Sequence, residues 1–177
     1  MKVLITGSNG QLGRTLLETK PKDIEIIAPS SKDFNLLKIK ECKEFLVAIK
    51  PDWIINAAAY TAVDLAETEP NKAMLINGEA PTEIAKTIKK IGGKILQIST
   101  DFVFDGNSTS PYKPIDEPNP INIYGKTKLF GERGIQEVLS NTNQYLIIRT
   151  SWVIGPIGNN FAMTMLKLHK CKEKISV

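Results

Sequence analysis

A tyrosine and a lysine four positions apart, Tyr124 and Lys128, are the side chains whose spacing best suits acid–base chemistry. Both fall within residues 123–139, where the apolar periodicity predicts a helix, so they would lie one turn apart on one face. An ammonium near a phenol stabilises the phenolate, so a tyrosine, whose ordinary pKa is about 10, can exchange protons closer to neutral pH. The pair alone is a weak indication, because Tyr and Lys recur at this spacing by chance.

Two hydroxyl side chains form a second chemical pattern. Residues 94–99 are a short apolar run that predicts a strand, with Ser99 at its carboxyl end and Thr100 directly after it. A hydroxyl at this place can hydrogen-bond a substrate carbonyl oxygen beside the tyrosine. A strand that ends in hydroxyls, followed by a helix with Tyr124 and Lys128, therefore indicates chemistry on a carbonyl compound.

Three glycines, Gly7, Gly10 and Gly13, follow the first predicted strand at intervals of three. In dinucleotide-binding proteins such glycines allow a tight turn, the approach of a pyrophosphate to the backbone, and close packing of the next helix. The helix predicted over residues 10–19 would direct free N–H groups and its positive dipole end at the phosphates. The spacing is GxxGxxG rather than GxGxxG, but its place between a strand and a helix predicts a dinucleotide site.

The end of the second predicted strand, residues 23–28, bears on the choice of dinucleotide. An acidic residue there would bind the adenosine ribose hydroxyls and repel a 2′-phosphate. None stands there, and Pro29 is followed by Ser30, Ser31 and Lys32, which could accept a phosphate. The pattern mildly favours NADPH, or tolerance of both NADPH and NADH, unless these are simply turn residues.

The rest of the chain continues the alternation of strand and helix. Further strands are predicted at residues 53–57, 94–99 and 145–150, the last continuing to 153. Further helices are predicted at residues 38–49, 71–90, 123–139 and 160–169. Gly78 and Pro81 interrupt the helix over 71–90, and Pro81 should kink or split it. Residues 105–122 are predicted to be a loop, and residues 175–177 the start of a strand that is cut off.

This alternation predicts the α/β class, with a Rossmann-type doubly wound parallel sheet that carries helices on both faces. The length of 177 residues suits one domain, spanning residues 1–177. Sheets of this type bind ligands at the carboxyl ends of their strands, near the switch in strand order.

Composition argues against several other classes. The single histidine, His169, argues against a Ser/His/Asp triad and a histidine-based metal site. Cys42 and Cys171 have no metal spacing and suggest no disulfide framework, which fits a reducing cytoplasm. We expect no signal peptide and no membrane span, because the apolar run at residues 3–5 is short and no stretch approaches the roughly 18 apolar residues of a span. The net charge of +4 is typical of a solvated lysine-rich surface, so no nucleic-acid partner is expected.

With these motifs in place, the sequence resembles the extended branch of the short-chain dehydrogenase/reductase superfamily. Within that branch it is most similar to the family of dTDP-4-dehydrorhamnose reductases. The segments that carry the resemblance are residues 7–13, 51–64, 99–106, 122–128, 149–153 and 159–161. The resemblance covers essentially the whole chain.

The resemblance implies reduction of the C4 ketone of dTDP-6-deoxy-L-lyxo-4-hexulose to dTDP-L-rhamnose, with hydride from NADPH or NADH. Tyr124 would donate the proton, while Lys128 would lower the pKa of Tyr124 and hold the nicotinamide ribose. Thr100 would hydrogen-bond the sugar oxygen, and Asp101 and Trp152 would line the sugar site. The catalytic residues implied are therefore Tyr124, Lys128 and Thr100.

The resemblance also implies the residues that hold the dinucleotide. The turn that would contact the pyrophosphate contributes Gly7, Asn9, Gly10, Gln11, Leu12 and Gly13. Ala58, Ala59 and Tyr60 match the segment beside the cofactor after the third strand. Ser30 lies where a phosphate would be accepted, and Asn35 falls where the family often has an aspartate near the adenine.

The sequence departs from the family pattern in two places. Some members dimerise through a magnesium ion held by glutamates, one of them two residues after the third glycine; Thr15 stands there, so no such metal is expected. The chain stops at Val177, where the family continues, so we expect the C-terminal substrate domain to be mostly missing. An apolar edge exposed in its place could produce a homodimer.

Two other functions remain open from the sequence. One is a non-catalytic dinucleotide-binding module that regulates a partner, since fold alone does not exclude it. The presence of Thr100, Tyr124 and Lys128 argues against this function, because a binding module needs none of them. The other is a different nucleotide-sugar reductase or an epimerase of the same superfamily.

Overall fold

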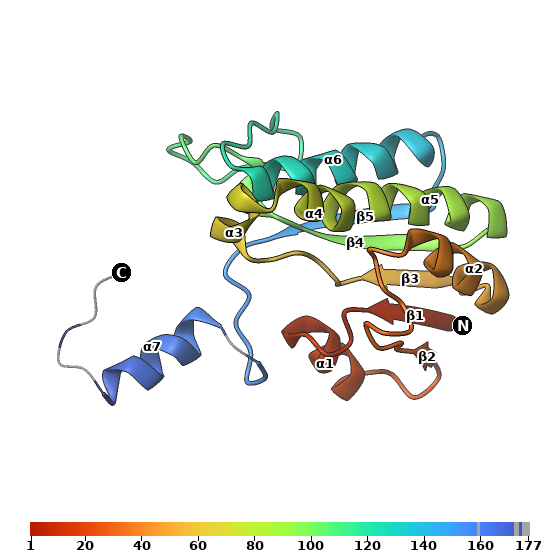
Figure 1. Cartoon of the computed structure of the whole chain (residues 1–177), viewed down its shortest axis with the longest axis horizontal. Helices are drawn as coiled ribbons and strands as arrows, with labels where there is room; N and C mark the ends of the chain where they lie inside the picture. The colour runs from red at the N-terminus through yellow and green to blue at the C-terminus, as the bar shows by residue number, and fades with distance from the viewer. Residues whose placement is uncertain (159, 172–173, 175–177) are drawn as a thin grey trace.

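Figure 1 shows a computed structural model of the chain, which describes residues 1–158, 160–171 and 174. Five strands form one sheet in the order β2-β1-β3-β4-β5, and every neighbouring pair is parallel. Their bounds are β1 Lys2–Thr6, β2 Glu25–Ile27, β3 Trp53–Asn56, β4 Lys94–Thr100 and β5 Tyr145–Thr150. The chain moves outward from β1 to β2 and then returns to the other side of β1, so the strand order switches between β1 and β3.

The helices connect these strands. They are α1 Gln11–Glu18, α2 Ile39–Ile49, α3 Val63–Thr68, α4 Pro70–Met74, the π-helical η1 Leu75–Glu79, α5 Ala80–Ile91, the 3-10 turn η2 Asp101–Val103, α6 Ile123–Val138 and α7 Phe161–His169. None of the helices in the described part of the chain combines the length and the apolar character that a bilayer crossing requires. The predicted Rossmann-type parallel sheet is confirmed.

The core lies between one face of the sheet and the layer of α2, α5 and α6. Leu4, Ile54 and Ile95 on neighbouring strands pack against buried residues of α5 and α6 such as Ile84 and Ile135. Each such apolar side chain contributes about 1.5–3 kcal/mol through burial. This layer holds α6 rigidly over the carboxyl half of β4.

The opposite face of the sheet is covered less completely. Figure 1 shows α1 on the side of the sheet away from α5 and α6, next to β1. Leu146 and Ile148 of β5 remain 48% and 38% exposed, because their side chains alternate with those that face α6. Helices therefore lie on both faces, as predicted, but very unequally.

The region between β3 and β4 differs most from the sequence prediction. Instead of one helix over residues 71–90, the structure has α4, η1 and α5 in succession, preceded by the unpredicted α3. Gly78 lies in the π-helical turn η1 and Pro81 follows it in the first turn of α5, so the regular α-helical pattern is interrupted where predicted, while the backbone on either side of η1 stays right-handed helical. The irregularity is the π-helical turn, whose buried Asn77 bonds to other elements.

The other differences are at element ends. The second strand is three residues long, and β5 ends at Thr150 rather than continuing to residue 153, because Trp152 adopts a left-handed backbone conformation with φ of 49°. The strand predicted at residues 175–177 lies outside the described residues.

Candidate active site

The glycine turn lies at the switch point of the sheet, directly after β1. Gly7 has φ of +65°, and a Cβ there would lie 2.7 Å from the backbone nitrogen of Ala58, which follows β3. Gly13 packs directly against the carbonyl of Gly7, so α1 starts tight against the turn. Gly10 caps α1 without a side-chain hydrogen bond from the described residues, which leaves the N–H groups of the first turn available to an anion.

Two cavities open on either side of this turn. The smaller, about 200 Å³, is lined by Asn9, Ser31 and Asn35 among others and lies toward β2. The larger, about 620 Å³, runs from Gln11 and Leu12 along Ala58 and Ala59 to the start of α6. A glycine cradle between two cavities fits an extended molecule with a phosphate centre, as a dinucleotide is.

Two of the predicted dinucleotide residues have side chains that are engaged elsewhere. The Ser30 hydroxyl donates to Asp33 at 2.6 Å, and it is Ser31 that lines the smaller cavity. The Tyr60 hydroxyl donates to Glu69 at 2.6 Å, and the cavity wall next to Ala59 is formed by Thr61 and Val63.

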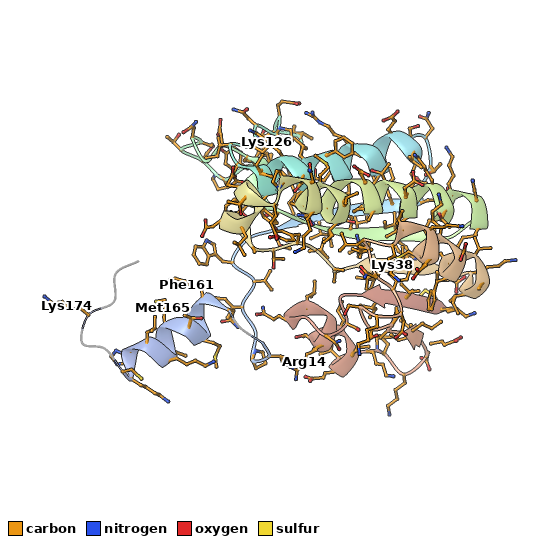
Figure 2. All side chains as sticks on the ribbon, viewed as in Figure 1. Arg14, Lys38, Lys126, Phe161, Met165 and Lys174 are labelled. Carbon is orange, nitrogen blue, oxygen red and sulfur yellow. The ribbon has the colours of Figure 1, made fainter. Side chains whose placement is uncertain are left out.

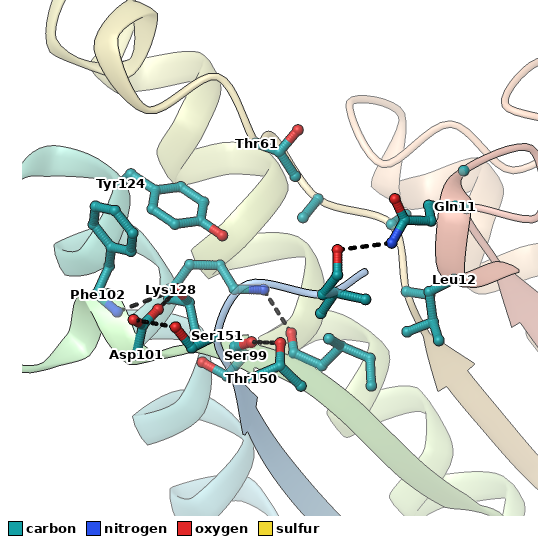
Figure 3. A pocket seen from close by; sticks show the side chains of 18 of the residues that line it. Gln11, Leu12, Thr61, Ser99, Asp101, Phe102, Tyr124, Lys128, Thr150 and Ser151 are labelled. Atoms are coloured by element: carbon teal, nitrogen blue, oxygen red, sulfur yellow. Dashed lines mark hydrogen bonds between the residues drawn. The ribbon is translucent and has the colours of Figure 1, made fainter. Parts of the chain in front are cut away.

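Thr100, Tyr124 and Lys128 all line the larger cavity. Figure 3 shows Tyr124 and Lys128 there, next to Ser99 and Asp101. Thr100 ends β4, while Tyr124 and Lys128 stand on the first two turns of α6. The start of α6 is fixed by a cap in which Asn122 Oδ1 accepts from the Gly125 amide at 2.7 Å. Gly125 in turn packs directly against the carbonyl of Phe102 in η2, which brings the helix down onto the end of β4.

Burial dominates the electrostatics of this pair. Lys128 is only 4% exposed and donates to the Ile98 carbonyl at 2.6 Å, and burial lowers its pKa to about 8. Burial also raises the pKa of Tyr124, the Thr100 hydroxyl opposes this rise, and the Asp101 carboxylate adds to it. The pKa of Tyr124 is therefore raised rather than lowered as expected, because burial outweighs the influences that favour the phenolate. A phenol with a raised pKa is protonated at neutral pH and can act as an acid.

The mouth of the cavity is formed by the segment that leaves β5. Ser151 donates to Asp101 at 2.7 Å, which holds that carboxylate at the edge of the site. Trp152 lines the cavity but remains 68% exposed, with its ring in edge contact with Phe161 at 4.8 Å between centroids. On the other side, Gln11 Nε2 donates to the Val153 carbonyl at 2.9 Å.

Comparison with protein families matches residues 1–177, the whole chain, to the family described as RmlD substrate binding domain. The chain belongs to this family. Among the described residues of this RmlD-family chain, no three His, Cys, Asp or Glu side chains gather in a group that could hold a metal ion.

The chain is also similar along its whole length to proteins that have assigned names. The dTDP-4-dehydrorhamnose reductase of Salmonella typhimurium is 41% identical over 181 residues, which cover 100% of this chain and 60% of the relative. The spore coat polysaccharide biosynthesis protein SpsK of Bacillus subtilis is 42% identical over 177 residues, covering 99% of this chain and 62% of the relative.

The chain is similar in backbone structure to solved proteins of the same name. The dTDP-4-dehydrorhamnose reductase of Bacillus anthracis in complex with NADP superposes with a TM-score of 0.93 at 41% identity, covering 99% of this chain and 62% of that chain. This RmlD-family chain thus spans about 60% of the length of the relatives it matches.

The structure of the RmlD-family chain places two further polar residues at the site: Ser99, noted in the sequence as a strand-end hydroxyl, and Asn77, which sequence reasoning did not assign. The Ser99 hydroxyl is buried at the cavity, with no hydrogen-bond partner among the described residues. Asn77 accepts from the Tyr60 amide at 2.9 Å and donates to Thr127 at 3.3 Å, so it joins the loop after β3 to α6. A π-helical turn is a common mark of a functional site, but no sequence pattern revealed this one.

Proposed function

We propose that this chain is the dinucleotide-binding and catalytic portion of a reductase that acts on a nucleotide-linked keto-sugar. The favoured reaction is reduction of the C4 ketone of dTDP-6-deoxy-L-lyxo-4-hexulose to dTDP-L-rhamnose. The observation that carries the proposal is the meeting of Thr100, Tyr124 and Lys128 in one cavity that continues to the glycine turn. The names of the Salmonella typhimurium and Bacillus anthracis relatives support the substrate.

We assign a role in dinucleotide binding to the glycine turn and to the lining of the smaller cavity. A nicotinamide dinucleotide, when bound, supplies the hydride. The backbone N–H groups at the start of α1 hold its pyrophosphate, with Gly7, Gly10 and Gly13 leaving the room for it. Asn35 and Ser31 line the cavity for the adenosine end.

At the other end of the cavity, the chain controls one proton. Tyr124 gives its hydroxyl proton to the sugar oxygen as the ketone becomes an alcohol, and its raised pKa keeps that proton in place until it is needed. The Lys128 ammonium stabilises the phenolate that remains. The Thr100 hydroxyl, which donates to Asp101 Oδ1 at 3.2 Å in the structure, would turn to donate to the same oxygen when the sugar is bound, and Asp101 and Trp152 border the sugar.

The surroundings of the smaller cavity favour NADPH over NADH. The turn after β2 places Pro29 and Ser31 at this cavity, and its nearby acidic residue, Asp33, is engaged by the Ser30 hydroxyl. No carboxylate is therefore presented there by the described lining residues to repel a 2′-phosphate. The NADP complex of the Bacillus anthracis relative is consistent with this preference.

The direct test is the oxidation of NADPH by the chain, followed by absorbance, with the keto-sugar nucleotide as substrate. Turnover that requires both components supports the reductase. Tight NADPH binding without turnover would favour the second candidate, a non-catalytic dinucleotide-binding module. Turnover with other nucleotide-linked keto-sugars, but not with this one, would place the chain with a different reductase of the superfamily.

We further propose that the chain acts in the cytoplasm and associates into a homodimer through the exposed apolar side of β5. Replacing Leu146 and Ile148 by lysine should convert the dimer to a monomer, because two charges would have to be buried at the interface. Light scattering after size-exclusion chromatography measures the mass. The matched control replaces Leu37 and Val47, which are exposed to a similar extent away from β5, and should leave the mass unchanged. A monomer for the unmodified chain at high concentration would contradict the proposal.

A further inference from the structure

A buried ion pair lies one helical turn beyond Lys128. Glu132 of α6 is 1% exposed, and Arg149 of β5 donates to it from Nη2 at 2.7 Å and from Nε at 3.1 Å. The guanidinium also lies over the ring of Phe104, with its central carbon 5.0 Å from the ring centroid. The carboxylate is thus held in one position by a two-pronged contact from the neighbouring strand.

Stability alone is a weak reason for such a pair. Taking two charges out of water costs several kcal/mol per ion, and a well-packed apolar pair of similar size is often as stable or more so. Apart from Lys128 and Thr127, the buried residues of α6 around Glu132 are apolar or small, such as Leu129, Gly131 and Ile135. A charged group kept in this setting calls for a role that an apolar group would not fulfil.

The neighbour that needs a negative charge is Lys128. It stands four residues before Glu132, so both side chains lie on the same face of α6, and both are buried. None of the ion pairs formed by the described residues includes Lys128, whose ammonium donates to the neutral Ile98 carbonyl. Burial lowers the pKa of Lys128 to about 8, and the Glu132 carboxylate opposes that fall.

The other groups around Lys128 do not replace this carboxylate. Tyr124 on α6 is neutral when protonated, and β4 contributes the hydroxyls of Ser99 and Thr100. The Asp101 carboxylate on η2 accepts from Ser151 and Thr100 at the cavity mouth, and it acts on the pKa of Tyr124, whereas Glu132 is the carboxylate that acts on Lys128. On the side of η1 the nearby polar group is the amide of Asn77, and Glu67 of α3 is engaged by the Ile123 amide.

We propose that Glu132, locked in place by Arg149, is a positioning residue that keeps the Lys128 ammonium charged beneath Tyr124. The inference rests on the proposed function, in which that ammonium stabilises the phenolate. Removing the carboxylate leaves Lys128 with a desolvated charge and the unpaired cation of Arg149 nearby. Lys128 then loses its proton at a lower pH. The pair of Tyr124 and Lys128 therefore loses its acid–base activity at a lower pH than in the unmodified chain.

A titration that needs no turnover tests this directly. The full chain is labelled with ¹³C-lysine, the Lys128 signal is assigned by its loss in Lys128→Arg, and its pKa is read by NMR. In Glu132→Gln we expect the Lys128 pKa to be about one pH unit lower than in the unmodified chain. The matched control is Glu117→Gln, which removes the same charge from the exposed pair with Arg133 and should leave the Lys128 pKa unchanged.

A second variant covers the case in which Glu132→Gln does not fold. Glu132→Gln combined with Arg149→Met removes both charges, so no unpaired ion is left in the interior. It should lower the Lys128 pKa in the same direction. An unchanged Lys128 pKa in the variants that fold would overturn the proposal, whether or not the chain turns over the keto-sugar.

The pH dependence of kcat distinguishes a positioning role of Glu132 from a merely structural one. In the active enzyme the alkaline limb of the kcat–pH profile should shift to lower pH in Glu132→Gln, with KM unchanged. A structural role would instead lower kcat equally at every pH and leave the limb in place, and that result would also overturn the proposal. If no turnover is found with any substrate, the proposed function fails while the titration still decides the role of Glu132.

Discussion

Tyr124→Phe is expected to lower kcat for keto-sugar reduction by about 10²- to 10⁴-fold, the contribution typical of a positioned general acid. The substitution removes only the hydroxyl from the cavity. Phenylalanine keeps the edge contact with Phe102, at 5.6 Å between ring centroids, so the shape of the site is preserved. NADPH oxidation measures kcat, and fluorescence titration should show an unchanged Kd for NADPH.

The control for this prediction is the same chemical change at another tyrosine. Tyr145 begins β5, at the amino end of the strands and far along the sheet from the cavity. Tyr145→Phe should therefore leave kcat within about twofold of the unmodified chain, since the ring keeps its packing against the core and the lost hydroxyl is remote from the cavity. Retention of more than a tenth of the turnover by Tyr124→Phe would remove Tyr124 from the role of proton donor.

Gly7→Ala is expected to abolish detectable NADPH binding and to lower the melting temperature. A Cβ at this residue would lie 2.7 Å from the Ala58 nitrogen and 2.9 Å from the Ala57 oxygen, both backbone atoms that cannot move aside cheaply. A left-handed conformation costs a non-glycine residue about 1–2 kcal/mol in addition. The turn must therefore shift away from β3, and the phosphate cradle is lost with it. Calorimetry of NADPH binding and thermal unfolding provide the two readouts.

Gly92→Ala separates the steric clash from the conformational cost. Gly92 has φ of +78°, similar to that of Gly7, but no atom lies within 4 Å of the position of its Cβ. Gly92→Ala should lower the free energy of unfolding by a similar conformational cost, while its affinity for NADPH stays unchanged. Equal NADPH affinity in Gly7→Ala and Gly92→Ala would show that the turn is not a phosphate cradle.

The sheet and the glycine turn could be predicted because they depend on local order in the sequence. Buried parallel strands appear as short apolar runs, and the turn between β1 and α1 needs glycine where two backbones touch at Gly7 and Gly13. Helical spacing places Tyr124 and Lys128 on one face, and together with the glycine turn and the strand-end hydroxyls this makes the pair recognisable. Thr100 was found for a similar reason, as the residue at a strand end.

The parts that were missed depend on contacts between distant segments. The side chain of Tyr60 turns to Glu69, and the hydroxyl of Ser30 turns to Asp33, choices that no periodicity encodes. Within the π-helical turn, Asn77 bonds both to the Tyr60 backbone and to Thr127, fifty residues away, and no periodicity reveals these contacts. Spacing predicts an ammonium near the Tyr124 phenol and hence a lowered pKa, whereas the depth at which the packed helix buries the phenol, which spacing does not reveal, raises it.

The order of the strands also sets how the protein should open and close on a timescale of minutes to hours. β4 is hydrogen-bonded on both sides, by β3 and β5, and is covered by α5 and α6, whereas β2 is three residues long and pairs with β1 alone. We therefore expect the amide hydrogens of β4 to exchange with solvent last and those of β2 to exchange early. Thr100 belongs to the slow strand, and the adenosine cavity borders the fast one. The residues around the smaller cavity, which we assign to the adenosine end, should thus open before the strand that carries Thr100.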